Sequence, residues 1–575
     1  MNEMEEMNVK KILALVLALM LCMSAAVAEG SILNMDSMFP VVNEPVELEF
    51  CIVYDSSMYG EWEDLWWWHY MEENTGVTIV PRLIAKDVWK EQSMIMLSSG
   101  DLPDVFFYGG WSPAEIYEYG LQDGIFIPLT EYVNDAELMP NLTAAFEMYP
   151  EAKAGSALPD GNIYGLPFMM SDYYVTASGY RAQWHTAWLN DIGIEDGNGI
   201  ETLDEFYNAL LAIRDADHNG NGQADEIPWS TYWGTDGKYG MNYVVGYILN
   251  ALGLATGDGL VAVNYNTGEA GYAPMMEEYY DALVFLNKLY AEGLIDTDMF
   301  SQTDADMCAK FGAGLSAFST HWNPGGCCTA EEWDAHTADN YGDTVLTYQK
   351  PMVDVKGETP IQGVSSKHGM NVFCITMACE NPEVAMRWAD SCYDLKTSMY
   401  YRCGPIFGSE DDDWKIGLSV DLENHKQNEY HEAREITGET DLSGYQWIQC
   451  HINSSASVGY FGLDETLGHR KYVDPLMYEP GIAPQWTDNY TRSIAPYEVD
   501  LYPNMYFTEE QNKVIELYKT SLDEYVIEMT AKFIAGENTL NEETWAEFQK
   551  SMEAYNGAEY NTVLFDAYET YKANA

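Results

Sequence analysis

Residues 215–226 read DADHNGNGQADE, and their oxygen-bearing side chains recur at the spacing of a calcium-binding loop. The pattern D-x-[DN]-x-[DN]-G-x5-E requires oxygen ligands at alternate positions, a glycine at the sharp turn and a bidentate glutamate at the end. Every fixed position of the pattern is met by Asp215, Asp217, Asn219, Gly220 and Glu226. The alternative interpretation is a surface turn, because turns use the same residue types for backbone reasons.

The flanks of this loop indicate a structural rather than a sensory role. Upstream, TLDEFYNALLAIRDA begins with the capping-box pair Thr202 and Glu205 and continues with apolar residues at helical spacing. Downstream, Ile227 precedes Pro228, which disfavours a helix there. A sensor of the EF-hand type needs two helices, because it responds through the angle between them. We therefore expect calcium as a structural cofactor.

No sequence motif supports catalysis. A secreted sugar hydrolase is the alternative from another class, since it needs only two carboxylates about 5–9 Å apart, and 92 acidic residues do not exclude such a pair. However, GxSxG, HExxH and GxxxxGK[ST] motifs are absent, and there is no Cys/His cluster at zinc spacing. The histidines His185, His218, His321 and His451 occur singly. We therefore expect a binding protein and not an enzyme.

The charge of the chain restricts its ligands. With 92 acidic and 28 basic residues, the net charge is -64. Such a surface repels phosphate backbones, which excludes nucleic acid and disfavours anionic membranes and polyanionic sugars. Aromatic residues make up 14% of the chain, including 42 Tyr and 17 Trp, and these rings stack on the flat faces of sugars. A neutral oligosaccharide is expected; a peptide or another cationic solute is the alternative.

The first residues predict export. Lys10 and Lys11 precede an apolar run of about a dozen residues that closes on Ala26-Val27-Ala28, as in a secretory signal peptide. We therefore expect residues 1–28 to be removed and the protein to be extracellular or at the cell surface. Lipid tethering through Cys22 is the alternative, although no small residue precedes this cysteine.

Strand-like and helix-like segments alternate along the chain. Strands are predicted over 46–54, 77–84 and 105–108, with a helix between each pair, which is typical of a parallel α/β sheet. Ligands lie beyond the carboxyl ends of such strands, which points to Tyr108 and Trp111. The last 70 or so residues are predicted to be helical. One helix starts at the capping pair Thr508 and Gln511 and carries a core-facing stripe of Val514, Leu517, Tyr518, Leu522, Tyr525, Met529 and Phe533.

Several stretches together resemble the family 1 extracellular solute-binding proteins of bacterial ABC importers. They are SSGDLPDVFF, LPDGNIYGLPF, TLDEFYNALLAIRDADHNGNGQADEIP, AFSTHW and VFCITMACENPEVAMRWAD, in the family's order. The resemblance implies a periplasmic-binding-protein-like α/β fold, with two lobes joined by a hinge and a helical C-terminal segment. It also implies capture of an oligosaccharide by a monomer, and delivery to ABC permease subunits.

The resemblance further implies domain bounds and site residues. Lobe 1 is expected over 31–170 and 356–400, and lobe 2 over 171–355, including the loop at 215–226, and 401–575. The expected ligand contacts are Tyr108, Trp111, Asp172, Tyr173, Trp233, Trp322 and Trp486. The implied calcium register differs from the EF-hand register in using Asp225 and not Asp215: Asp217, Asn219, Asn221, the carbonyl of Gln223, Asp225 and Glu226.

Overall fold

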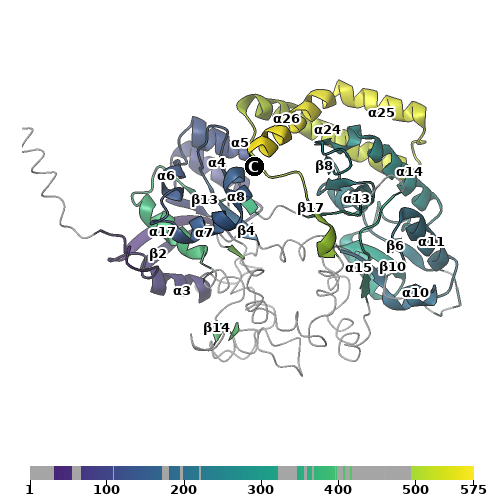
Figure 1. Cartoon of the computed structure of the whole chain (residues 1–575), viewed down its shortest axis with the longest axis horizontal. Coiled ribbons are helices and arrows are strands. Elements are labelled where there is room, and N and C mark those ends of the chain that lie inside the picture. Colours follow the sequence, from purple (N-terminus) through teal and green to yellow (C-terminus); the bar gives the residue numbers. More distant parts are fainter. Residues whose placement is uncertain are drawn as a thin grey trace, which may run out of the picture.

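The structure is a computed structural model of the 575-residue chain. It describes residues 31–54, 62, 66–107, 109–170, 181–194, 199–218, 220, 222–223, 225–321, 346–354, 359–364, 368–394, 397, 406–407, 415–416, 460–461 and 494–574. Two bodies, lobe 1 and lobe 2, are each built around one large mixed sheet, and three C-terminal helices run along the top of lobe 2 (Figure 1). Within the described part of the chain, no helix combines the length and apolarity that a membrane span requires.

Lobe 1 contains a six-stranded sheet in the order β16-β4-β13-β3-β1-β2. Its strands are β1 (Val46–Val53), β2 (Val77–Ile84), β3 (Val105–Phe107), β4 (Leu166–Met170), β13 (His368–Ile375) and β16 (Tyr460–Phe461). The central strand β1 is parallel to β2 and β3, whereas β13 is antiparallel to β3 and β4. The first three strands confirm the strand and helix alternation that the sequence predicts.

Successive residues of these strands pack on opposite faces of the sheet, which explains its two-sided core. On one face, Phe50 meets Trp388 edge to face with ring centroids 5.0 Å apart. On the other face, Cys51 and Phe106 pack in a second cluster. Pro81 is tolerated because β2 is an edge strand.

The helices of this lobe are α3 (Trp66–Thr75), α4 (Trp89–Ser99), α5 (Pro113–Ile116), η2 (Tyr117–Gln122), α6 (Thr130–Val133), α7 (Pro140–Met148), α8 (Pro150–Ser156) and α17 (Pro382–Cys392).

Lobe 2 contains a four-stranded sheet in the order β11-β5-β10-β6. Its strands are β5 (Arg181–His185), β6 (Ile227–Ser230), β10 (Ser316–His321) and β11 (Leu346–Tyr348). Since β10 and β6 are parallel, their carboxyl ends share one edge of the sheet. The helices are α10 (Thr186–Asp191), α11 (Leu203–Arg214), α12 (Lys238–Gly240), η3 (Met241–Val245), α13 (Gly246–Ala251), η4 (Ala273–Met275), α14 (Glu277–Ala291) and α15 (Asp304–Gly312). Smaller sheets are formed by β7 (Leu254–Thr256), β8 (Val261–Asn264) and β9 (Ala270–Tyr272), by β12 (Gln362–Val364) and β17 (Glu498–Asp500), and by β14 (Ile406–Phe407) and β15 (Lys415–Ile416).

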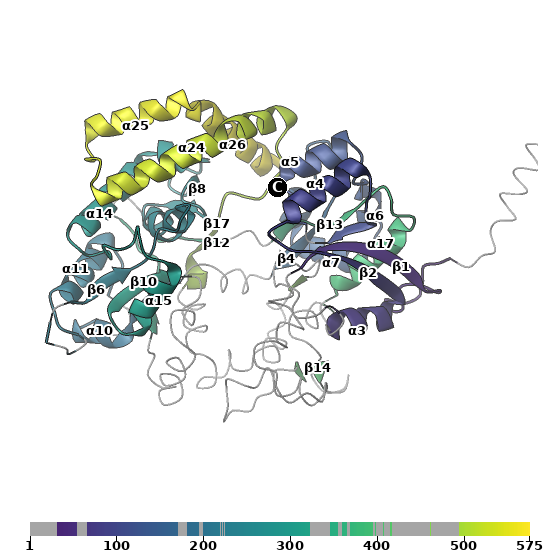
Figure 2. The same cartoon turned by 180° about the vertical axis from the view of Figure 1, so that it is seen from behind.

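The C-terminal helices pack on lobe 2, and the last of them reaches toward lobe 1. They are α24 (Glu509–Ala535), α25 (Glu542–Ala554) and α26 (Gly557–Asn574), and η6 (Ala495–Tyr497) precedes them. Both views show α26 running toward α5 (Figure 1, Figure 2). The predicted capping box of Thr508 and Gln511 is confirmed. The predicted stripe is confirmed at Leu522 and Phe533, which are fully buried, and is wrong at Leu517, which is 68% exposed. Val526, which the stripe omits, is buried as well.

The predicted domain bounds stay a proposal. In favour of them, β4 and β13 belong to the lobe 1 sheet, and β5, β10 and β11 belong to the lobe 2 sheet. In contrast, β16 lies within the 401–575 range that we expected in lobe 2, yet it pairs with β4 of the lobe 1 sheet. The last crossing between the lobes runs through residues 501–508, between β17 and α24.

Candidate functional site

The structure describes two of the seven predicted ligand contacts. Trp111 and Trp233 are described, whereas Tyr108, Asp172, Tyr173, Trp322 and Trp486 lie outside the described residues. The prediction that these side chains contact a ligand therefore stays a prediction.

Trp111 lies beyond β3, as the strand pattern predicts, but its side chain is packed in lobe 1. It is 4% exposed and meets Phe106 and Phe126 with ring centroids 5.2 and 5.3 Å apart. A side chain at Gly109 would overlap the indole rings of Trp111 and Trp89, so the turn after β3 requires glycine there. The Trp111 ring therefore packs within lobe 1 and supports the backbone at the end of β3.

Trp233 follows β6 and is also buried, with 6% of its surface exposed. Its ring lies 5.2 Å from that of Phe300, and Gly240 packs directly against it. Its backbone N–H donates to the carbonyl of Met299 at 2.8 Å. This packing fixes the backbone of the segment after β6, which carries several tyrosines.

Three tyrosines of that segment form a ladder at the carboxyl edge of the lobe 2 sheet. Tyr239 stacks on Tyr232 and on Tyr243, with ring centroids 3.7 and 4.2 Å apart and interplanar angles of 27° and 16°. All three side chains are half-buried. The hydroxyl of Tyr239 donates to the carbonyl of Thr320 at 2.9 Å, which ties the ladder to the end of β10. Such rings combine a flat apolar face with a polar edge.

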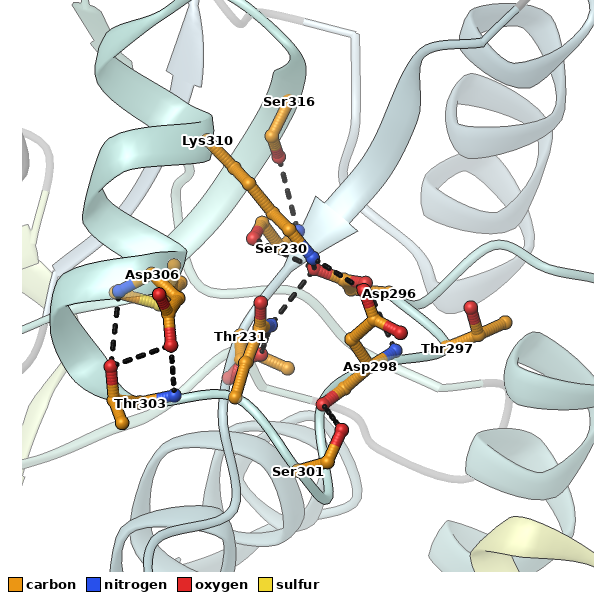
Figure 3. A network of polar contacts seen from close by, with 12 residues as sticks. Ser230, Thr231, Asp296, Thr297, Asp298, Ser301, Thr303, Asp306, Lys310 and Ser316 are labelled. Carbon is orange, nitrogen blue, oxygen red and sulfur yellow. Dashed lines mark hydrogen bonds and ion pairs between the residues drawn. The ribbon is translucent and has the colours of Figure 1, made fainter.

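A partly buried polar network lies at the carboxyl end of β6 (Figure 3). Lys310 reaches from α15 and places Nζ 2.8 Å from Oδ2 of Asp296 and 3.0 Å from Oδ2 of Asp298. Gln302 donates to the same Asp296 oxygen at 2.8 Å and to the carbonyl of Thr231 at 2.5 Å. Burial opposes the charge of Lys310, but its hydrogen bonds to the two aspartates raise its pKa above the ordinary value. The network fixes α15 and the end of β6 relative to each other.

The predicted calcium loop connects α11 to β6, so one helix enters it and a strand leaves it, as the sequence predicts. The helix begins with the predicted capping box of Thr202 and Glu205. Within the loop, Gly220 and Gly222 adopt φ values of +71° and +85° and curl the backbone, and Oδ2 of Asp217 accepts a hydrogen bond from Gly222 N–H at 2.8 Å.

The described ligands of the loop have the oxygen chemistry that calcium prefers. Glu226 is 6% exposed, and its Oε1 accepts a hydrogen bond from the backbone N–H of His218 at 2.5 Å. Asp215 is different, because its carboxylate pairs with Nε of Arg214 at 2.7 Å and is 64% exposed. The hydrogen bond from Arg214 lowers the pKa of Asp215. Asp217 and Glu226 belong to both registers, so only the pairing of Asp215 with Arg214 bears on the choice, and the calcium register stays a prediction; Asn219 and Asn221 lie outside the described residues.

The segment at 501–508 connects the two lobes. Tyr506 is buried in lobe 1, where its hydroxyl lies 2.5 Å from Oδ1 of Asn371, and Asn371 Nδ2 donates to the carbonyl of Trp111 at 3.1 Å. Asn371 has a positive φ of 59°, a conformation that asparagine tolerates. Most residues of this segment, Tyr502 among them, line a cavity of about 440 Å³ together with Pro113 of α5 and with Lys519 and Tyr560 on the lobe 2 side. The segment is therefore anchored in lobe 1 and borders this cavity.

Two α/β lobes with chain crossings between them are an architecture that suits ligand binding between the lobes. Comparison with known proteins extends this inference. No protein-family model matches the chain. The chain is 24% identical over 517 residues to the fructooligosaccharide ABC transporter substrate-binding protein FusA of Streptococcus pneumoniae serotype 4 (strain ATCC BAA-334 / TIGR4), with 88% of this chain and 86% of FusA covered.

Solved structures confirm the fold. The S. pneumoniae FusA EF-hand mutant in complex with fructo-nystose has a TM-score of 0.67 at 21% identity, covering 92% of this chain and 100% of that one. An HMO-binding solute-binding protein from Bifidobacterium longum infantis ATCC 15697 has a TM-score of 0.69 at 19% identity, with coverage of 92% and 99%. The alginate-binding protein AlgQ2 without calcium ion has a TM-score of 0.60 at 19% identity, with coverage of 92% and 99%. Over most of its length, the chain is therefore similar to extracellular solute-binding proteins of ABC transporters and shares their fold.

Sequence reasoning missed the tyrosine ladder. The segment YWGTDGKYGMNY is rich in aromatic residues, but only Trp233, its largest ring, was predicted to contact the ligand. The available signal was the pair Tyr239 and Tyr243, which are spaced i and i+4 and so lie on one face of a helical turn. Tyr232 joins them only because the chain turns back between β6 and α12.

Proposed function

We propose that this protein captures a neutral oligosaccharide between its two lobes and delivers it to the permease subunits of an ABC importer. The observation that carries the choice of ligand is the ladder of Tyr232, Tyr239 and Tyr243 at the edge of the lobe 2 sheet. The two outer rings, Tyr232 and Tyr243, are half-buried and offer stacking surfaces to sugar rings, each contributing about 1 kcal/mol beyond the area buried. The similarity to FusA and to the HMO-binding protein supports the same ligand class.

Capture follows from lobe closure in this proposal. A ligand that contacts both lobes only in the closed state shifts the equilibrium toward closure by its difference in affinity for the two states. Tyr506 anchors the 501–508 segment in lobe 1 through Asn371, which leaves the neighbouring residues to absorb the rotation. Binding without bond cleavage is the expected chemistry, so the protein acts as a carrier and not as an enzyme.

Calcium, export and a monomeric state complete the proposal. Asp217, Asn219, Asn221, the carbonyl of Gln223, Asp225 and Glu226 would hold one calcium ion and join α11 to β6. The FusA EF-hand mutant and the structure of AlgQ2 without calcium ion support a metal site in related folds. The signal peptide predicted over residues 1–28 would export the chain to the cell surface, where it would meet the permease.

A thermal-unfolding screen in calcium tests the proposal. The chain would be screened against neutral fructo-, gluco- and galacto-oligosaccharides, uronate oligomers and short basic peptides, and each mixture would then be chromatographed. At about a hundred times its dissociation constant, a ligand stabilises the folded state by roughly 2.7 kcal/mol. We expect one neutral sugar to raise the melting temperature and to be recovered intact. Cleavage of the sugar, or stabilisation only by peptides, would contradict the proposal.

Variants of the ladder locate the site. Tyr232→Ala and Tyr243→Ala are expected to weaken the binding of the sugar found in the screen by about fivefold or more each, because each removes an outer ring of the ladder. Tyr555→Ala is the matched control, since Tyr555 is 38% exposed on the C-terminal helices. Isothermal titration would measure the affinities. Equal affinities for all three variants and the wild type would remove the ladder from the site.

A further inference from the structure

Three side chains of different elements converge at the end of β10, next to the tyrosine ladder. Asp304 and Cys308 lie at i and i+4 of α15, so they share one face of that helix, and His321 is the last residue of β10. Their potential ligand atoms all lie within 4.8 Å of one another. Among the described residues this is the single group of three or more Asp, Glu, Cys and His side chains with that property.

We propose that Asp304, Cys308 and His321 form a binding site for a divalent transition-metal ion, with zinc as the expected ion. Thiolate, imidazole and carboxylate are the protein ligands of zinc, and a set of three with an open fourth position is a recognised arrangement. Two anionic ligands and one neutral ligand balance the charge of a divalent ion. Calcium, in contrast, prefers oxygen ligands only, which separates this site from the 215–226 loop.

The distances between the three side chains fit the proposed ion. Tetrahedral zinc holds nitrogen, oxygen and sulfur ligands about 3.4–3.6 Å from one another. Nε2 of His321 lies 3.0 Å from Oδ1 of Asp304, and Sγ of Cys308 lies 3.9 Å from the same oxygen. These two separations lie on either side of that value, and the Sγ of Cys308 and the nearest nitrogen of His321 lie within 4.8 Å of each other.

The surrounding structure holds the three ligand side chains in place and leaves one of them accessible to an ion from solvent. The first turn of α15 is fixed by a capping box between Thr303 and Asp306, and β10 pairs with a strand on each side. The side chain of His321 is 2% exposed, whereas that of Asp304 is 50% exposed. The ion would therefore enter from the side of Asp304 and reach two buried ligands.

The ordinary alternative is a hydrogen bond between a histidine and an aspartate at the start of a helix. In that alternative Asp304 Oδ1 would also accept a weak hydrogen bond from the Cys308 thiol, whose Sγ lies 3.9 Å away and which is 8% exposed. A bound ion would use all three side chains. It would also join α15 to the end of β10, where Tyr239 has its ring centroid 6.2 Å from that of His321.

Metal titration of the mature chain tests this site. The protein is freed of metal with a chelator, returned to excess calcium so that the 215–226 loop is satisfied, and titrated with Zn²⁺ against a chromophoric chelator. Co²⁺ is then used as a spectroscopic probe, because a thiolate ligand gives it a charge-transfer band. We expect one equivalent of zinc, and a cobalt spectrum with tetrahedral and thiolate features.

The variants decide which residues bind. Cys308→Ser is expected to abolish the thiolate band and to weaken zinc binding by about a hundredfold or more, since even loss of a supporting residue costs about ten- to a hundredfold. Asp304→Asn changes a half-exposed side chain and is the second variant if Cys308→Ser does not fold. Cys379→Ser, at a half-buried cysteine of lobe 1, is the control and is expected to behave as wild type. No zinc uptake, or a thiolate band that persists in Cys308→Ser, would overturn the proposal.

Discussion

At the scale of single residues, the contact between Tyr506 and Asn371 determines how the 501–508 segment is held. The two side chains lie 2.5 Å apart in a buried environment, and burial raises the pKa of the Tyr506 hydroxyl far above its ordinary value. The hydroxyl is therefore protonated and donates. Without it, the Asn371 oxygen would be buried and unsatisfied, which costs about 1–3 kcal/mol.

We therefore expect Tyr506→Phe to destabilise the protein by about 1–3 kcal/mol without changing the volume of the core. Urea unfolding followed by tryptophan fluorescence would measure the loss. Tyr555→Phe, on an exposed ring, is the control and should unfold as wild type. If both variants were equally stable, the Tyr506 hydroxyl would not be the anchor of this segment.

A second residue, Asp390, makes the free energy of unfolding depend on pH. Asp390 on α17 is 1% exposed, and its carboxylate accepts from Leu142 N–H at 2.9 Å and from Asn141 Nδ2 at 3.0 Å. Burial raises the pKa of Asp390 from 3.8 to about 6, and these hydrogen bonds only partly oppose it. Between those values the folded state binds more protons than the unfolded state, so stability falls as pH rises.

For Asp390, the fall between pH 5 and pH 7 should be roughly 1.4 kcal/mol, equivalent to about one pKa unit. Asp390→Asn cannot titrate, so its free energy of unfolding relative to wild type should rise by that amount across the same interval. Urea unfolding at several pH values would measure the difference, with Glu516→Gln on the solvent side of α24 as the control. A difference that stayed constant with pH would show that Asp390 is ionised throughout.

At the scale of elements, the loop between α11 and β6 makes the calcium register testable. Asp215 is already paired with Arg214, whereas Glu226 is buried at the start of β6. Asp225→Ala should therefore abolish the rise in melting temperature on adding calcium, while Asp215→Ala should keep it. Differential scanning fluorimetry with calcium and with EDTA would measure both. Loss of the calcium effect in Asp215→Ala alone would restore the EF-hand register.

Much of the element order could be predicted from the sequence, because local rules determine it. The alternation in VELEFCIV and the capping boxes at Thr202 and Thr508 each gave an element with nearly the correct bounds. The buried face of α24 could not be predicted in full. Helical periodicity alone places Leu517 on the apolar stripe, but α24 is longer than the surface that covers it, so this position remains exposed.

The candidate site depends on contacts between segments far apart in the sequence, and this limited its prediction. Residue type alone suggests that a tryptophan after a strand stacks on a sugar ring. In the structure, however, Trp111 and Trp233 are buried, with only 4% and 6% of their surfaces exposed. The sequence contains no sign that glycines at 109 and 240 pack against these rings. The cluster of Asp304, Cys308 and His321 could not be predicted for a related reason, because a helix and a separate strand contribute its side chains.

At the scale of the whole molecule, the net charge of -64 distinguishes the possible ligands by their response to salt. Such a charge attracts cations and repels anions over distances of about a Debye length, which shortens from roughly 14 to 4 Å between about 0.05 and 0.5 M salt. A neutral oligosaccharide carries no charge on which this field can act. Its dissociation constant should therefore change less than about twofold over that range.

Charged ligands should behave differently, and in opposite directions. A basic peptide should bind more weakly as salt rises, and a uronate oligomer should bind more tightly, because salt screens attraction in one case and repulsion in the other. Isothermal titration of each class at several salt concentrations, in constant calcium, would measure the slopes. A dissociation constant for the neutral sugar that rose about tenfold with salt would contradict capture by stacking and hydrogen bonding, because screening can weaken only an interaction between charges.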